Sequence, residues 1–379
     1  MSEQEMFTSP PVLYTQEQLD RLEDFITENY GDFPKVFRDT SPVGIKLDIA
    51  VIPPNSDNHF VTLVTMGFGA YRMNTPRELA DKKLERAELV LCLPPNWKFD
   101  DDKPENMWPV ELLNRLAHLP VRNKTWLGWG HSVDYNKPFS EDTELSAVLL
   151  LGTAFGDKAS VCPLENDEEV NFYQVIPLYD IEMRYKIEKC TDALLDRFGS
   201  ELDPVLDLER RAAVTEADFE LIDRVEEHSR KVTEKQLDTY ELNGANHIAA
   251  FIRWCIEHEM INDEFTDFFA DELANISSGK LDIRKFVMNY LGGEFTKEIL
   301  TDEGQAFADF YYDFYADEDA PCYPEDVDYM AKDYFGEEKY NCEEFQNEAY
   351  LFVPYGEEYY VRITKYINEN YRKFSGLAQ

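Results

Sequence analysis

Apolar and polar residues follow different periods in the two halves of the chain. Between residues 45 and 51, apolar side chains take every second position, which is the pattern of a strand with one solvent-facing side. Four apolar runs of strand length predict further strands, at 60–66, 88–93, 147–151 and 172–176. From residue 236 onward, apolar residues recur every three or four positions and predict helices, as in the series Phe265, Phe268 and Phe269.

Four helices are expected among the strands of the first half, and one of them is a short polar helix over 77–85. Thr15 and Gln18 form a capping box that predicts a helix over 15–30. A second helix is expected to take Pro109 as its first residue, because proline suits that position. The apolar positions of 180–198 predict one long helix. Helices and strands thus mix without strict alternation. The expected fold class is an α+β domain, with a mixed sheet and flanking helices, followed by a mainly α-helical domain.

The length of the chain indicates two domains. It has 379 residues, of which 44% are hydrophobic, and this is too long for one ordinary core. We expect an α+β domain over 1–211, a charged connector over 212–235 that could itself be helical, and an acidic, tyrosine-rich helical domain over 236–379.

Cysteine usage and hydropathy indicate a cytoplasmic protein without membrane association. The six cysteines are widely spaced and form no C-x-x-C pair, so neither a disulfide framework nor a zinc ribbon is expected. The N-terminus is acidic, and no run of about 18 apolar residues occurs in the chain. Cys92 lies within an apolar run, where we expect a core thiol with a raised pKa.

Net charge limits the classes of partner. The chain has 37 basic and 76 acidic residues, a net charge of -39, which repels nucleic acids and anionic membranes. Residues 1–200 contain 20 basic and 34 acidic residues (net -14), and residues 201–379 contain 17 and 42 (net -25). This acidity can serve solubility alone, or it can attract a basic protein partner to the second half.

Two tryptophans, two glycines and a histidine occur within six residues, in the stretch Trp126-Leu127-Gly128-Trp129-Gly130-His131. Glycines permit close backbone approach, and tryptophans supply packing area. His131 could be catalytic, but no serine or cysteine nucleophile stands in a recognisable motif. The alternative is a histidine that donates a hydrogen bond to a backbone carbonyl within an aromatic cluster.

Several segments together resemble the suppressor of fused domain, in its bacterial form. The matching segments are Arg86–Trp97, which ends in Leu-Pro-Pro-Asn-Trp, Trp108-Pro109 with the helix around it, Thr125–His131, and Asn171–Tyr179. The resemblance covers roughly residues 43–211. It identifies Trp97, Trp108, Pro109, Trp126, Gly128, Trp129, Gly130 and His131 as a fold signature rather than an active site.

The resemblance implies a domain that binds proteins and does not turn over a substrate. Animal relatives hold a transcription factor through an added peptide strand between two domains. Bacterial relatives resemble immunity proteins that neutralise a polymorphic toxin. The second half of this chain departs from the animal arrangement, because it is helical and tyrosine-rich.

The sequence predicts neither a cofactor nor a metal site. His247 and His258 are eleven positions apart, so on one helix they would be separated by about 16 Å, too far to share a metal ion. The acidic clusters lack the spacing of a calcium-binding loop. Gly67-x-Gly69 lacks the third glycine of a phosphate-binding loop.

Residues 307–319 alternate aromatic side chains with carboxylates. On a helix, Phe307, Phe310, Tyr311 and Phe314 would face the core. The outward residues form the predicted partner-binding surface: Asp309, Tyr312, Asp313, Tyr315, Asp317, Glu318 and Asp319. Tyrosine offers rigid contact area, and the carboxylates would steer a cationic partner. A helix that is buried on one side and merely solvated on the other explains the pattern equally well.

Three hypotheses of function follow. The leading one is a non-enzymatic immunity protein that binds a basic toxin domain, perhaps of the nuclease type, through the acidic helical half. The second is an adaptor that captures an extended peptide by strand addition. The third is a hydrolase that uses His131.

Overall fold

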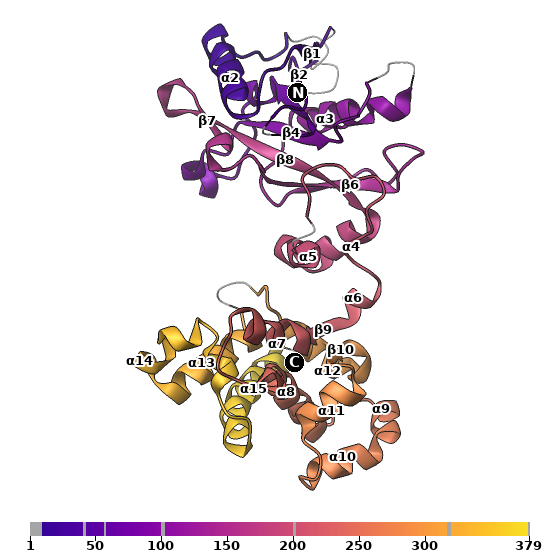
Figure 1. Cartoon of the computed structure of the whole chain (residues 1–379), viewed down its shortest axis with the longest axis vertical. Helices are drawn as coiled ribbons and strands as arrows, with labels where there is room; N and C mark the ends of the chain where they lie inside the picture. Colours follow the sequence, from indigo (N-terminus) through magenta and orange to yellow (C-terminus); the bar gives the residue numbers. More distant parts are fainter. Residues whose placement is uncertain are drawn as a thin grey trace. The chain divides into compact units, whose positions relative to one another are not determined.

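The chain folds into two compact units that divide after Val214 (Figure 1). The computed structural model describes residues 10–40, 43–56, 58–99, 103–199, 202–316 and 320–377. The connector expected at 212–235 is not a separate segment, because residues 215–235 belong to the second unit. Val225 in this stretch is buried in the core of that unit.

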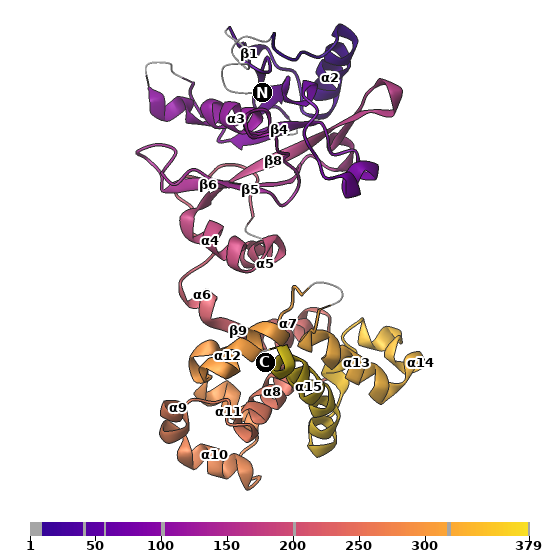
Figure 2. The ribbon, with the colours of Figure 1, turned by 180° about the vertical axis from the view of Figure 1, so that it is seen from behind.

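A mixed sheet of eight strands forms the centre of the first unit in its described part. The strands are β1 (Lys35–Phe37), β2 (Asp48–Ile52), β3 (Val61–Met66), β4 (Ala87–Leu93), β5 (Ser132–Asp134), β6 (Leu145–Gly152), β7 (Val161–Pro163) and β8 (Glu169–Tyr179). Their order is β1-β2-β3-β4-β8-β6-β5, and β7 also pairs with β8. The β4–β8 pair is parallel, and the neighbouring pairs β3–β4 and β6–β8 are antiparallel. The long strand β8 crosses this unit in both ribbon views (Figures 1 and 2).

Helices cover both faces of this sheet. The helices of the unit are α2 (Gln16–Asn29), α3 (Pro104–Asn123), α4 (Asp180–Glu188) and α5 (Thr191–Phe198). Strand side chains point alternately to opposite faces, so Leu89 and Leu91 of β4 pack in the core beneath α3. Val90 and Cys92 pack in the core beneath α2. The prediction of an interior strand at 88–93 is confirmed, and burial raises the pKa of Cys92 to about 12.

The capping box at Thr15 and Gln18 is confirmed, because each side chain bonds the backbone of the other residue. Two other helix predictions are wrong. Helix α3 begins at Pro104, which takes the first-turn role in which a missing N–H costs nothing, so Pro109 lies inside the helix. The long helix expected over 180–198 is broken at Cys190, where the backbone is extended and the thiol accepts from the Ala193 amide to cap α5.

The second unit is mainly helical. It contains α6 (Ala217–Glu220), α7 (Val225–Glu234), α8 (Asn246–Glu257), α9 (Asp263–Phe268), α10 (Ala270–Ser277), α11 (Ile283–Tyr290), α12 (Asp302–Tyr311), α13 (Tyr323–Phe335), α14 (Glu337–Tyr340) and α15 (Glu357–Leu377). Strands β9 (Leu221–Arg224) and β10 (Glu294–Thr296) form an antiparallel pair. Helix α8 is buried along most of its length and lies at the centre of the core. The predicted fold class, α+β followed by mainly α-helical, is confirmed. Among the described residues, no helix combines the length and apolar character needed to cross a membrane.

Candidate functional site

The predicted binding segment begins on α12 and continues beyond its end. Asp309 is exposed, and its Oδ1 forms an ion pair with Nζ of Lys297 at 2.8 Å. Asp313 is half-buried and accepts a hydrogen bond from the Tyr315 amide at 2.9 Å. Tyr315 is 38% exposed. Three further residues of the prediction lie outside the described part of the chain, namely Asp317, Glu318 and Asp319.

The prediction that Tyr312 faces outward is wrong. Its side chain is 5% exposed, and its hydroxyl donates to Oδ2 of Asp223 at 2.6 Å. Phe314, which was expected in the core, is 42% exposed. Helix α12 ends at Tyr311, so the helical period no longer decides which of the following side chains point inward.

The fold-signature residues on and before α3 form an aromatic contact. The Trp97 indole donates to the backbone carbonyl of Asn106 at 3.0 Å. Its ring meets Trp108 edge-on, with 6.2 Å between the centroids. These contacts tie the end of the β4 segment to helix α3.

The loop Trp126–His131 divides into packed and exposed positions. A Cβ at Gly128 would lie 2.7 Å from the Trp126 ring, so only glycine fits there without a shift. The His131 ring stands edge-on to Trp126 at 4.3 Å. Burial lowers the pKa of His131, and a hydrogen bond with the Trp126 backbone opposes this shift. Trp129 is 51% exposed and therefore does not serve core packing as expected.

Gly67 and Gly69 hold a carboxylate of the chain itself. Their amides donate to Oε1 of Glu88 at 2.9 and 3.0 Å. The Tyr14 hydroxyl donates to the same oxygen at 2.9 Å, and the Thr65 hydroxyl donates to Oε2 at 2.6 Å. Glu88 is fully buried, and burial raises its pKa to about 7 although these hydrogen bonds lower it. Four neutral donors thus surround this carboxylate.

A second buried carboxylate, that of Asp223, meets two histidines in the second unit. Its Oδ1 lies 2.9 Å from Nε2 of His228, and its Oδ2 lies 3.1 Å from Nε2 of His247. The two Nε2 atoms are 3.2 Å apart. The three residues are 3%, 6% and 2% exposed. We call Asp223, His228 and His247 the histidine–aspartate cluster.

Three adjacent elements build this cluster. Asp223 lies on β9, where strand alternation turns its side chain into the core and that of Arg224 outward. His228 lies on α7 and His247 on α8. The cluster was not predicted from the sequence, because Asp223 and His228 fall in the expected connector and His247 was compared only with His258 along the helix. The signal that could have found it is a histidine within the apolar α8 segment, where an unpaired polar side chain is costly.

Tyrosines surround the cluster. The Tyr350 hydroxyl lies 2.8 Å from Nδ1 of His228. The Tyr323 hydroxyl donates to the backbone carbonyl of His247 at 2.8 Å. Nδ1 of His247 is buried and has no hydrogen-bond partner among the described residues. The Phe314 ring is tilted against that of His228, with 6.1 Å between the centroids, so the first residues after α12 pack beside the cluster.

Burial and neighbouring charges shift the pKa values of Asp223, His247 and Tyr312 in different directions. Burial alone would raise the pKa of Asp223, but His228 and then His247 hold it well below its usual range. Burial and the neighbouring His228 lower the pKa of His247 to about 4. Burial, with Asp223 adding to it, raises the pKa of Tyr312 well above its ordinary value. At neutral pH the cluster therefore contains an ionised carboxylate and a neutral His247. Imidazole nitrogens and a carboxylate are the donors that bind divalent transition metals.

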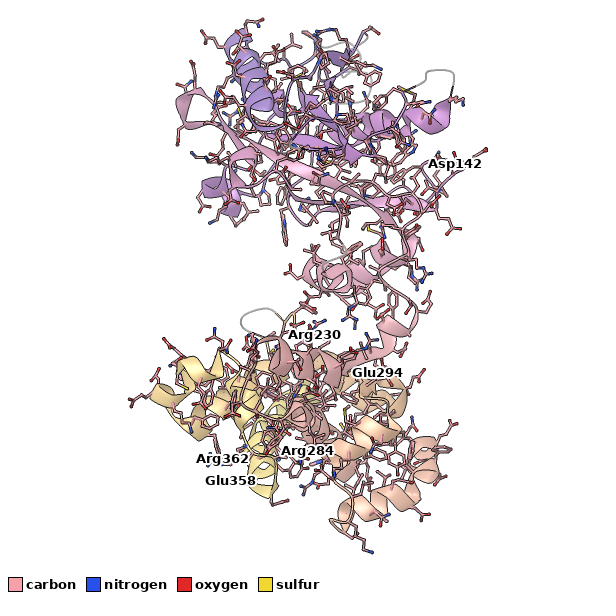
Figure 3. All side chains as sticks on the ribbon, in the orientation of Figure 1. Asp142, Arg230, Arg284, Glu294, Glu358 and Arg362 are labelled. Carbon is pink, nitrogen blue, oxygen red and sulfur yellow. The ribbon has the colours of Figure 1, made fainter. Side chains whose placement is uncertain are left out.

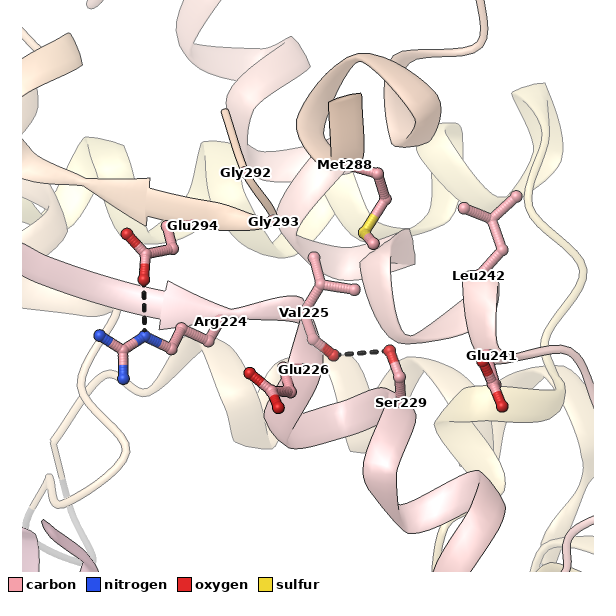
Figure 4. A pocket seen from close by; sticks show the side chains of 10 residues that line it. All are labelled: Arg224, Val225, Glu226, Ser229, Glu241, Leu242, Met288, Gly292, Gly293 and Glu294. Atoms are coloured by element: carbon pink, nitrogen blue, oxygen red, sulfur yellow. Dashed lines mark hydrogen bonds and ion pairs between the residues drawn. The ribbon is translucent and has the colours of Figure 1, made fainter. Parts of the chain in front are cut away.

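A surface pocket of about 470 Å³ lies beside α7 (Figure 4). Arg224 and Glu294 line it and pair at 3.0 Å, and the Ser229 hydroxyl donates to the Val225 carbonyl at 2.7 Å. The lining contains no residue of the histidine–aspartate cluster. The pocket and the cluster are therefore distinct features of the described chain.

Comparison with known proteins places the first unit in a family. Residues 44–211 match the family model described as Suppressor of fused protein (SUFU). The first unit is a suppressor of fused domain. This confirms the resemblance inferred from the sequence motifs. Residues 221–342 of the second unit match the model described as Domain of unknown function (DUF7832). This range includes the histidine–aspartate cluster.

Relatives of the suppressor of fused domain include bacterial proteins. The chain is 28% identical over 204 residues to Uncharacterized protein UU111 of Ureaplasma parvum serovar 3, covering 53% of this chain and 98% of that protein. A SUFU homologue from Neisseria gonorrhoeae FA 1090 is 19% identical, with coverage of 54% and 98% and a TM-score of 0.40. The Sufu-Fu complex structure is 15% identical, with coverage of 54% and 93% and a TM-score of 0.38.

Proposed function

We propose that this suppressor of fused domain protein is a non-enzymatic binding protein that holds a basic protein partner on the acidic surface of its second unit. The observation that carries the proposal is the exposure of large aromatic side chains among carboxylates in this unit. Aromatic anchors supply contact area, and a surrounding field of one sign attracts a partner of opposite charge.

The charge of the second unit supports a cationic partner. Residues 215–379 contain 15 Lys and Arg against 38 Asp and Glu, a difference of -23. Figure 3 labels one of its ion pairs, Arg362 with Glu358 on α15. Ten of the 15 basic residues form ion pairs in the described part: Arg224, Arg230, Lys231, Lys235, Arg253, Arg284, Lys297, Lys332, Arg362 and Lys373. Local cations are thus largely neutralised, and excess carboxylates remain to attract a partner.

The exposed aromatic residues mark where such a partner could anchor. Phe268, at the end of α9, is 78% exposed, although its place in an apolar series predicts burial. The carboxylates of Asp267 and Asp271 are exposed on either side of it in the sequence. Tyr315, which follows α12, and Tyr329, on α13, are 38% and 57% exposed. Phe268 is therefore a candidate anchor in addition to the predicted partner-binding residues.

In its most specific form, the proposal is that the partner is a toxin domain and that this chain is an immunity protein. A nuclease-type toxin needs a basic surface to bind the phosphate backbone of its substrate. A carboxylate-rich surface with aromatic anchors is complementary to such a domain and would occlude it by direct binding.

The test is to measure the binding of this chain to a toxin domain encoded by the neighbouring gene, over a series of NaCl concentrations. We expect fast association that slows steeply with salt. Changing Asp309, Asp313, Asp317 and Asp319 together to Asn, or Phe268→Ala alone, should each weaken binding by about tenfold or more. The control neutralises four exposed carboxylates of α2 in the first unit, namely Glu17, Asp20, Glu23 and Asp24. An affinity indifferent to salt, or an equal loss in the control, would contradict the proposal.

A second candidate function is the capture of an extended peptide at the sheet edge of the first unit. Strand β5 ends the strand order, and the half-exposed Trp129 lies three residues before it. Strand addition supplies backbone hydrogen bonds, and an exposed tryptophan supplies an anchor. Loss of binding in Trp129→Ala, with the acidic variants unaffected, would favour this function over the first.

A further inference from the structure

We propose that Asp223, His228 and His247 bind one divalent transition-metal ion of the zinc class in the second unit. These residues are the one group of three or more His, Cys, Asp or Glu side chains within metal-binding reach among the residues that the structure describes. All three are buried, so the group is not an ordinary patch of surface carboxylates. The proposal is independent of the partner surface described above.

The spacing of the donor atoms fits a single ion. Bonds of about 2.0–2.2 Å to zinc place the ligand atoms of a tetrahedral site about 3.3–3.6 Å apart. The observed separations are 2.9 Å from Asp223 to His228, 3.1 Å from Asp223 to His247 and 3.2 Å between the two Nε2 atoms. The side chains would need to separate by only a few tenths of an ångström.

The kind of donor selects the kind of metal. Two imidazole nitrogens and one carboxylate suit zinc and its neighbours in the first transition row, whereas calcium and magnesium prefer sites made entirely of oxygen. Both histidines present Nε2 toward the carboxylate, so both lone pairs can reach the same point. One position of a four-coordinate ion would remain for a further ligand, and the Tyr312 hydroxyl lies 2.6 Å from the carboxylate.

The two histidines differ in the hydrogen-bond partner of the ring nitrogen that would not bind the metal. When His228 binds a metal through Nε2, its Nδ1–H can donate to the Tyr350 hydroxyl at 2.8 Å. Nδ1 of His247 has no partner among the described residues. Such outer partners typically change metal affinity by about 10–100-fold. We therefore expect weaker zinc binding than in a fully supported structural site.

A bound ion would join three elements of the unit. The donors come from β9, α7 and α8, which bring together residues up to 24 positions apart in the chain. An ion that binds only the folded state stabilises it by mass action. The inferred role is to fasten β9 and α7 onto the central helix α8.

The experiment uses tag-free, full-length protein that has been stripped with a chelator. Zinc chloride is titrated calorimetrically in excess magnesium, because magnesium competes for surface carboxylates but poorly for imidazole nitrogen. We expect one zinc ion per chain and a higher melting temperature. Cobalt(II) should give the visible absorption of a nitrogen- and oxygen-ligated site in the same stoichiometry.

Variants separate this site from adventitious binding. His228→Gln, His247→Gln and Asp223→Asn should each lose the site, seen as at least a tenfold weaker affinity and loss of the cobalt spectrum. The matched controls are His258→Gln, at the C-terminal cap of α8, and His59→Gln, in the first unit; both positions are exposed, and both variants should bind zinc normally. Circular dichroism identifies any variant that fails to fold. If all three variants fail to fold, the number of zinc ions bound per wild-type chain decides whether the site exists. A wild-type chain that binds no zinc in excess magnesium, or a folded His228→Gln that binds normally, would overturn the proposal in favour of a purely hydrogen-bonded cluster.

Discussion

Each unit buries a carboxylate within a hydrogen-bond network, and the two networks differ in one respect. Glu88 in the first unit receives hydrogen bonds from two backbone amides and two hydroxyl groups, all of them neutral. Asp223 in the second unit faces the nitrogens of two histidines, which can carry a proton or a metal ion. The burial is similar, at 0% and 3% exposed, so the difference lies in the partners.

The partners decide what each carboxylate can do. Burial raises the pKa of Glu88 to about 7, because neutral donors only partly replace the water that it has lost. The pKa of Asp223 is low despite equal burial, because His228 and His247 favour its charged form. The first arrangement fixes a turn around Gly67 and Gly69. The second gathers the donors of a cation site.

The largest expected effect comes from replacing each carboxylate by its amide in metal-free protein. Asp223→Asn should lower the local unfolding free energy of α8 by about 3 kcal/mol, because it removes the ionised acceptor that faces His228, His247 and the Tyr312 hydroxyl. Glu88→Gln should lower that of β4 by only about 1 kcal/mol, because an amide oxygen still accepts from Gly67 and Gly69. Hydrogen exchange followed by mass spectrometry reads the two elements separately. Equal losses would mean that the two networks are equivalent.

The two units should also respond to pH with opposite signs. The folded pKa of Glu88 is raised above its unfolded value of 4.5, so its stabilisation is full below pH 4.5 and is lost as pH rises through about 7. The folded pKa of His247 is lowered from 6.5 to about 4, so its stabilisation is full above pH 6.5 and is lost as pH falls through about 4. Each contribution is of the order of 3 kcal/mol.

The pH prediction is checked by hydrogen exchange of metal-free protein between pH 4.5 and 6.5, corrected for the intrinsic exchange rate. Protection of β4 should decrease as pH rises over this range, while protection of α8 should increase. Glu88→Gln serves as the control, because it should flatten the response of β4 and leave that of α8 unchanged. A common trend in both elements would count against the assigned carboxylate and histidine.

A smaller effect is expected from adding a methyl group beside Glu88. In Gly69→Ala, the new Cβ would lie 2.2 Å from the Tyr14 hydroxyl, so Tyr14 must move away from the carboxylate. Overpacking of this kind should cost about 2 kcal/mol. Gly152→Ala is the control, because nothing lies within 4 Å of its Cβ, and it should change stability by less than about 0.5 kcal/mol. Similar melting temperatures for the two variants would contradict the close approach at Gly69.

The smallest effect is expected from removing one hydroxyl group from each network. Tyr14→Phe and Tyr312→Phe each delete a donor to the buried carboxylate, at 2.9 and 2.6 Å. We expect losses of about 1 kcal/mol, larger for Tyr312 because its acceptor is ionised at neutral pH. Both losses are measured by denaturant unfolding, with hydrogen exchange of the peptides from each unit as the readout. A greater loss at Tyr14 would reverse the assigned charge states.

The fold could be predicted where local chemistry alone decides it. The capping box of Thr15 and Gln18 and the apolar run of β4 needed no distant partner to be recognised. The break at Cys190 could not be predicted in this way, because the apolar positions of 180–198 continue through it on one helical face. The prediction that the helix begins at Pro109 was wrong because Pro104, five residues earlier, suits the first position equally well.

The candidate site could not be predicted from the sequence, because tertiary packing assembles it. His247 was compared with His258 along one helix, whereas its actual partners come from β9 and α7. Tyr312 was assigned by helical period to the surface, but the helix ends one residue earlier. The acidity of the second half was visible in the sequence, while the exposure of Phe268 and the burial of Tyr312 depend on where each helix stops.

The measurement that tests the comparison most directly is the zinc content of full-length, tag-free protein prepared in zinc-replete medium and passed through excess magnesium. We predict one zinc ion per chain in the wild type and in Glu88→Gln, and none in His228→Gln. A wild-type chain without zinc, or equal zinc in His228→Gln, would contradict the account.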